Sequence, residues 1–260
     1  MNFFLEQSLA YAQQRSYLDD LYHVYPTINN NIRDIDTEIW NEVEYAYDAK
    51  DKEGLILSLL KLDLFPIKDA YVGFLKQDKS SLKRNPKTVN RLAADILKMN
   101  KKKLFEKCSE PKESNRQQGP AFQRFLINED MGIKKMNIAD FTSSTEDAIL
   151  IASDKEMDNF ARKNLFYTHN KRPDFLARMN GKYILGEAKF LTSDGGHQTG
   201  QFEDAMGVLD SNAGAIKVAI LDGILYLPSD KKMYKDITGR HSECNIMSAL
   251  LLKDFLYTVK

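Results

Sequence analysis

The chain has 260 residues, enough for one large domain or two modest ones, and its 43% hydrophobic and 28% charged residues are typical of a soluble globular protein. No apolar run approaches the roughly 18 residues that a membrane-spanning helix needs, and residues 1–6 lack the basic start of a secretory signal, so we expect a cytoplasmic protein with no membrane partner. Cys108 and Cys244 are too few for a disulfide framework, and neither they nor the four histidines show zinc-ligand spacing.

The first part of the chain shows helical periodicity almost throughout. Apolar side chains recur there every three or four positions, as on the buried face of a helix. The predicted helices cover residues 2–24, 34–50, 53–62, 66–76, a segment starting at 86, and 101–108. Pro66 fits a first helical turn, and Asn85 followed by Pro86 opens the next long helix, because proline is tolerated where no intrahelical N–H bond is needed.

The net charge of zero conceals an uneven distribution. Residues 1–53 carry 11 acidic and 4 basic residues, whereas residues 79–107 carry 10 basic and 2 acidic residues. A concentrated basic stretch suits contacts with phosphate groups, for which the overall charge matters less. A charged run by itself is more often a solvated helix face, so this stretch alone does not identify a partner.

The middle of the chain begins with a polar loop over residues 115–120, followed by a helix through Phe122 and Leu126. An apolar run over 148–152 comes next. Ser153 and Glu156 then form a capping box, in which each side chain satisfies a free backbone N–H group, so a helix is predicted over residues 154–164.

A hairpin is the strongest local signal in the chain. Asn180 and Gly181 separate two strand-like segments, and this dipeptide suits a type I′ turn, in which both central residues have positive φ. Because side chains alternate along a strand, Glu187 and Lys189 share one face of the second segment. Asp174 lies at the far end of the first segment, so folding the hairpin brings it beside them.

Two carboxylates and an ammonium group that converge in this way can support phosphodiester chemistry. Paired carboxylates suit Mg²⁺, a cation that prefers oxygen ligands and keeps part of its water shell. The metal can activate a water and stabilise charge on a phosphate, while a lysine can orient that water. An ordinary ion pair on an exposed hairpin is the competing interpretation, because the pattern of charges alone is loose.

The last part of the chain alternates helix and strand. A loop containing two glycines leads into a helix that starts near His197, with Gln198 and Gln201 one turn apart. Strands are predicted over 217–221 and 224–227, and a final helix over 242–257.

The hairpin and its surroundings resemble a nuclease superfamily. Pro173-Asp174 followed by Glu187-Ala188-Lys189 is similar to the PD-(D/E)xK motif, and the segments at 115–120, 153–157 and 190–205 are similar to type II restriction endonucleases. The resemblance covers the second half of the chain better than the first. It implies that Asp174 and Glu187 bind Mg²⁺ and that Lys189 is the catalytic lysine. Related nucleases often supply a further acid from an earlier helix, and the candidates here are Glu156, Glu42 and Glu44.

Beside this motif, several polar residues become candidates for contacts with DNA. Arginine and glutamine side chains match the base edges of guanine and adenine in the major groove, and basic side chains contact the phosphate backbone. The candidate DNA-binding residues are Arg116, Gln117, Gln118, His197, Gln198, Gln201, Lys87 and Arg91.

The sequence therefore predicts an α/β fold with a restriction-endonuclease-like core. In this interpretation residues 136–260 form the catalytic core around a mixed central sheet flanked by helices, and residues 1–135 form a mainly helical region that grips DNA and contributes to dimerisation. The predicted function is a type II restriction endonuclease that makes Mg²⁺-dependent double-strand cuts at a short sequence, acting as a homodimer because two-fold symmetry mirrors a palindrome. The alternatives are a structure-specific repair or recombination nuclease of the same fold and a non-catalytic DNA-binding module.

Overall fold

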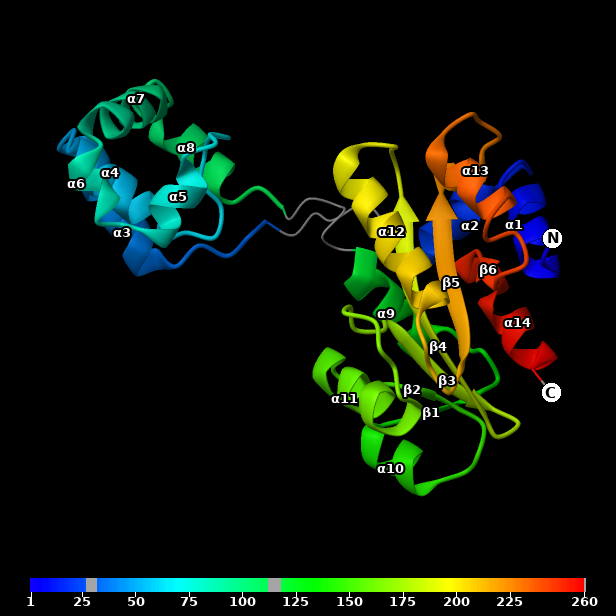
Figure 1. Ribbon diagram of the computed structural model, residues 1–260. Coiled ribbons are helices and arrows are strands. Elements are labelled where there is room, and N and C mark those ends of the chain that lie inside the picture. The colour runs from blue at the N-terminus through cyan, green and yellow to red at the C-terminus, as the bar shows by residue number, and fades with distance from the viewer. Residues whose placement is uncertain (27–31, 112–117, 260) are drawn as a thin grey trace. The chain divides into compact units, whose positions relative to one another are not determined.

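The computed structural model describes residues 1–26, 32–111 and 118–259, which fall into two compact units (Figure 1). Unit 1 combines residues 1–27 with residues 114–260, and unit 2 comprises residues 28–113, inserted between them. The boundaries of these units differ from the predicted division at residue 135. That division assigns roles in DNA gripping and catalysis, and it stays a prediction.

Unit 1 is built on a six-stranded sheet with the order β1-β2-β3-β4-β5-β6. β3 runs antiparallel to its neighbours β2 and β4, and the remaining pairs are parallel, which confirms the predicted mixed sheet. The strands are β1 (Lys134–Met136), β2 (Ala148–Leu150), β3 (Phe175–Met179), β4 (Lys182–Leu191), β5 (Ile216–Gly223) and β6 (Ile246–Met247).

The predicted hairpin forms between β3 and β4. Asn180 and Gly181 have φ angles of 49° and 73°, as a type I′ turn requires. The register pairs Phe175 with Gly186, so the residue before Phe175 lies beside the middle of β4. This register brings the carboxylate of Asp174 to the strand that carries Glu187.

Helices cover both faces of the sheet (Figure 1). One layer packs with Leu185 of β4, and the other packs with Ile184 and Ala188, which point to the opposite face. The first layer contains α10 (Ile138–Ser143) and α11 (Asp154–Leu165), and the second contains α1 (Phe3–Tyr11), α2 (Tyr17–Val24), α9 (Gln118–Asn128) and α14 (Leu252–Thr258). The helix α12 (Gly196–Asp210) packs against β4 and β5. The predicted capping box at Ser153 and Glu156 is present at the start of α11.

Four predictions about unit 1 are wrong in detail. The single helix expected over 2–24 is two helices, because Ser16 adopts a left-handed conformation with φ 78° between them. Residues 118–120 belong to the first turn of α9 and not to a loop, while residues 115–117 lie outside the described residues.

The predicted strand at 224–227 is also wrong. Gly223 turns the chain off the sheet with φ 104°, and residues 224–226 form the 3₁₀ turn η2 (Ile224–Tyr226), followed later by α13 (Lys232–Thr238). The sixth strand comes instead from β6, where Ile246 pairs with Ala219, inside the helix predicted over 242–257. Only η3 (Ala249–Leu251) and α14 are helical there.

Unit 2 is a helical module with its own apolar core, which includes Leu55, Leu59 and Leu92. Its helices are α3 (Thr37–Asp48), α4 (Lys52–Leu59), α5 (Val72–Gln77), α6 (Ser81–Arg84), α7 (Pro86–Leu97) and α8 (Lys101–Cys108). Pro86 occupies the first turn of α7, as predicted. The prediction for Pro66 is wrong, because it precedes α5 by several residues. Within the described ranges, no helix combines the length and apolar character that crossing a membrane requires.

Candidate active site

The structure brings Asp174, Glu187 and Lys189 together on one face of the hairpin. The ammonium of Lys189 lies 2.8 Å from Oδ2 of Asp174 and 2.6 Å from Oε1 of Glu187. Glu187 and Lys189 point to the same side of β4, as strand alternation requires. The convergence expected from the sequence is therefore present in the fold.

Backbone contacts hold Asp174 at this position. Its N–H group donates to the carbonyl of Gly186 at 2.9 Å, and its carboxylate accepts the N–H of Ala188 at 3.1 Å. The side-chain amide of Gln123 on α9 donates to the Asp174 carbonyl at 2.6 Å. Gln123 was not predicted from the sequence, because no local pattern connects it with a residue 51 positions away. Asp174 is thus fixed by β4 and by α9.

Gly186 permits the close pairing of β4 with β5 beside the site. A Cβ atom at this position would lie 2.4 Å from Cγ2 and 2.5 Å from the backbone oxygen of Val218. Contacts this short are not tolerated, so a side chain at residue 186 would push β5 away from the strand that carries Glu187 and Lys189.

The electrostatics of the site depend on burial. The side chain of Glu187 is only 5% exposed, and this loss of hydration, together with the charge of Asp174, raises the pKa of Glu187 to about 7. Burial alone would lower the pKa of Lys189, but the charges of Asp174 and Glu187 more than offset it and raise that pKa. Lys189 therefore stays charged at neutral pH, while Glu187 is balanced between its two forms.

The carboxylates present fit a magnesium ion. Oε2 of Glu187 is buried and has no hydrogen-bond partner among the described residues, so it is free to coordinate a cation. Within the described ranges, no group of three or more His, Cys, Asp or Glu residues is arranged to hold a metal. Asp174 and Glu187 would supply two carboxylates to the ion, and water would complete its shell, as is common for Mg²⁺.

The three acids considered as further ligands have other partners or surroundings. Glu156 accepts hydrogen bonds from the backbone N–H and hydroxyl of Ser153 in the capping box. In unit 2, Glu42 pairs with Lys61, and Glu44 borders a surface hollow together with Lys101. The capping contacts of Glu156 already account for its position.

The buried side chain of Gln198 forms hydrogen bonds that order the loop after β4. This side chain is 5% exposed, and its oxygen accepts the N–H groups of Thr192 and Ser193 at 2.5 and 2.8 Å. Gln201 lies at the surface, 3.5 Å from the ring Nε2 of His197. The amide of Gln198 therefore points into the loop, because the N–H groups of Thr192 and Ser193 need an acceptor and Gln198 supplies it. Contact of either glutamine with DNA stays a prediction.

The remaining predicted contact residues have different surroundings. Arg116 and Gln117 lie outside the described residues, and only the backbone of Gln118, in α9, is described. Lys87 is exposed in the first turn of α7, with no ion pair among the described residues. Arg91 pairs with Asp69 at 2.6 Å.

The basic stretch at 79–107 is largely neutralised within unit 2. Among the described residues, six of its ten basic residues form ion pairs with acids of the same unit, so fewer cations are free than the sequence suggests. These paired residues are Arg84, Arg91, Lys98, Lys101, Lys103 and Lys107.

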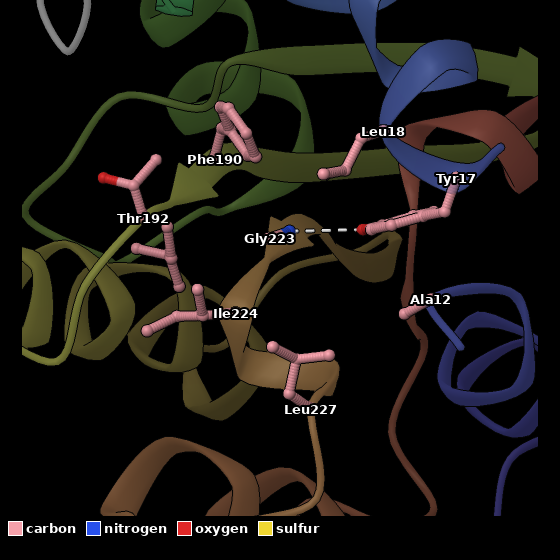
Figure 2. Close-up of a pocket in the computed structure, with 9 residues that line it drawn as sticks. Ala12, Tyr17, Leu18, Phe190, Thr192, Gly223, Ile224 and Leu227 are labelled. Carbon is pink, nitrogen blue, oxygen red and sulfur yellow. Dashed lines mark hydrogen bonds between the residues drawn. The ribbon is translucent and has the colours of Figure 1, made fainter. Parts of the chain in front are cut away.

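An apolar pocket of about 310 Å³ lies beyond the end of β4, on the side of α1 and α2 (Figure 2). Tyr17 points across it toward Gly223, whose N–H donates to the Tyr17 hydroxyl at 3.2 Å. Phe190, Ile224 and Leu227 contribute apolar side chains. None of the three converging charged residues borders this pocket, and its apolar lining does not suit a phosphate group.

Comparison with known proteins identifies a family for the chain. A family model described as "Tsp45I type II restriction enzyme" matches residues 2–259, which include both compact units and the hairpin site. Comparisons with curated proteins and with solved structures gave no match. Because the family match extends over nearly the whole length, the chain belongs to the Tsp45I family of type II restriction enzymes, which cleave DNA.

Proposed function

We propose that Asp174, Glu187 and Lys189 form the centre with which this restriction enzyme hydrolyses phosphodiester bonds. The observation that carries the proposal is the pair of carboxylates on one half-buried lysine, with Oε2 of Glu187 unpartnered among the described residues. A purely structural ion pair gains nothing from a buried, unsatisfied carboxylate oxygen, because such an atom costs free energy.

Each residue has a distinct role in the proposed reaction. Asp174 and Glu187 hold Mg²⁺, which when bound lowers the pKa of a water and stabilises charge on the phosphate. Glu187 must lose its proton to bind the ion, and its raised pKa makes this step sensitive to pH near neutrality. Lys189 keeps its charge, orients the attacking water and neutralises the negative charge that develops on the phosphate.

The enzyme acts in the cytoplasm as a homodimer on double-stranded DNA, cutting both strands at a short specific sequence. Support for the dimer comes from symmetry: two copies supply one active site per strand and match a palindromic target. Residues 1–135 grip the DNA and contribute to dimerisation, and residues 136–260 carry the chemistry.

Several side chains contact the substrate in this proposal. His197 is exposed and Gln201 is half-buried in the first turns of α12, the helix that follows the strand carrying Lys189. In unit 2, exposed Lys87 contacts phosphate, and Arg91 does so when DNA displaces Asp69. Gln198 contributes by shaping the loop, and the segment with Arg116, Gln117 and Gln118 reads base edges.

The test is a digest of plasmid DNA with Mg²⁺, followed by sequencing of the cut ends. We expect discrete fragments whose ends share one short sequence, and no cutting when EDTA removes the metal. A smear without a shared end sequence would contradict sequence specificity, and undiminished cutting in EDTA would contradict the role of the metal.

A further inference from the structure

Hydrogen bonds and an ion pair hold the segment that leads to Asp174 against α12. Residues 166–173 connect α11 with β3, and their contacts cross to the helix that follows β4. The ring Nε2 of His169 lies 3.1 Å from the carbonyl of Asp204, and Lys171 pairs with the Asp204 carboxylate at 3.3 Å. The backbone N–H of Thr168 donates to the carbonyl of Asn212 at 3.1 Å, just beyond the end of α12.

The His169 ring occupies a notch that exists because residue 207 is glycine. A Cβ atom at Gly207 would lie 2.8 Å from Cε1 and 2.9 Å from Nε2 of the ring. Glycine inside a helix is about 1 kcal/mol less favourable than alanine, and here the missing Cβ provides the space for the ring. A carbonyl oxygen only accepts hydrogen bonds, so the ring Nε2–H is the donor to Asp204.

The other side of His169 is also fixed. Its backbone carbonyl accepts a hydrogen bond from Nη2 of Arg162 at 2.8 Å, and Arg162 is anchored on α11 by Asp158 at 2.9 Å. His169 is therefore held between α11 and α12, five residues before Asp174. Because α12 packs along β4, the same helix lies against the strand of Glu187 and Lys189 and against the segment that delivers Asp174.

We propose that His169 is a positioning residue for Asp174. It acts through its contacts with Asp204 and Gly207 of α12, which we call the clasp. The proposal rests on the proposed metal-binding role of Asp174. The clasp fixes where the segment 166–173 enters β3, and so it sets the separation of the two carboxylates before the metal arrives. Groups that hold a metal ligand in place typically change metal affinity when they are removed.

The experiment measures Mg²⁺ binding to the full-length protein without DNA, by isothermal titration calorimetry. We expect His169→Ala and Gly207→Ala to weaken Mg²⁺ binding about 10-fold or more. Gly200→Ala is the matched control, because it adds the same methyl group to α12 where a Cβ meets nothing within 4 Å. His169→Gln, whose amide can donate to the Asp204 carbonyl, should restore most of the affinity.

A double variant makes the test specific to the notch. In a His169→Ala background the ring is gone, so adding Gly207→Ala should weaken binding no further. Melting curves identify a variant that fails to fold, and Gly207→Ala and His169→Gln then decide the question. If Gly207→Ala binds Mg²⁺ as tightly as Gly200→Ala, or if His169→Gln binds as weakly as His169→Ala, the proposal is overturned.

Asp174→Asn separates this proposal from the one on which it rests. Loss of Mg²⁺ binding in Asp174→Asn, together with normal binding in the His169 and Gly207 variants, would refute the clasp and leave the catalytic assignment intact. Normal Mg²⁺ binding in Asp174→Asn would refute the metal-binding role itself, and the clasp proposal would fall with it.

Discussion

Binding of Mg²⁺ to this site should depend on pH through Glu187. Burial raises the pKa of this carboxyl to about 7, so the metal-free protein holds a proton there in about half of the molecules at neutral pH. Only the ionised carboxylate binds the ion, so binding at pH 7 should release about half a proton from this group. The ionised fraction falls from about nine tenths at pH 8 to about one tenth at pH 6.

The apparent affinity for Mg²⁺ should therefore fall about 10-fold from pH 8 to pH 6. Calorimetric titration in buffers of different ionisation enthalpy measures both the affinity and the number of protons released. Glu187→Gln is the control, since it removes the titrating group and should bind weakly at every pH. An affinity that stays constant between pH 6 and pH 8, with no proton release, would refute the reasoning.

Three further predictions follow from other parts of the structure. Gly186→Ala should lower the free energy of unfolding by about 1–3 kcal/mol, because the added Cβ would collide with Val218. In the control Gly196→Ala the added Cβ has no neighbour within 4 Å, so this variant should have the melting temperature of the parent. Burial raises the pKa of Asp222 to about 7 from 3.8, so its contribution to stability is present below pH 3.8 and is lost as the pH rises through 7. When the pH is raised from 5 to 8, the free energy of unfolding of Asp222→Asn should therefore decrease less than that of the parent, as measured by urea unfolding at each pH. Lys87→Ala should weaken DNA binding and reduce its salt dependence by about one counterion, and an unchanged slope in a salt titration would exclude a phosphate contact.

Local signals explain why the hairpin and several helix starts were predictable. The conformation of Asn180 and Gly181 follows from the turn they form, and the capping box of Ser153 and Glu156 from contacts three residues apart. Because register follows from the turn, the convergence of Asp174 with β4 could also be predicted. These features depend on neighbours in the sequence.

The features that were missed depend on distant partners. Ile246 forms a strand because β5 offers it an edge, and residues 224–226 leave the sheet because Gly223 adopts φ 104° against the backbone of Leu191. The contacts of Gln123 with Asp174 and of His169 with α12 likewise join residues far apart in the sequence. Gln198 is a further example. Its spacing predicts a position in a helix, but not that its side-chain amide turns toward the loop and accepts the N–H of Thr192.

The most direct test of the central claim compares the parent enzyme with Asp174→Ala and Lys189→Ala on the same plasmid. Cleavage is followed with Mg²⁺, and DNA binding is measured separately with Ca²⁺ in place of Mg²⁺. We expect both variants to bind DNA with specificity close to that of the parent and to lose cleavage. Normal cutting by either variant with Mg²⁺ present would contradict the assignment of the catalytic centre to Asp174, Glu187 and Lys189.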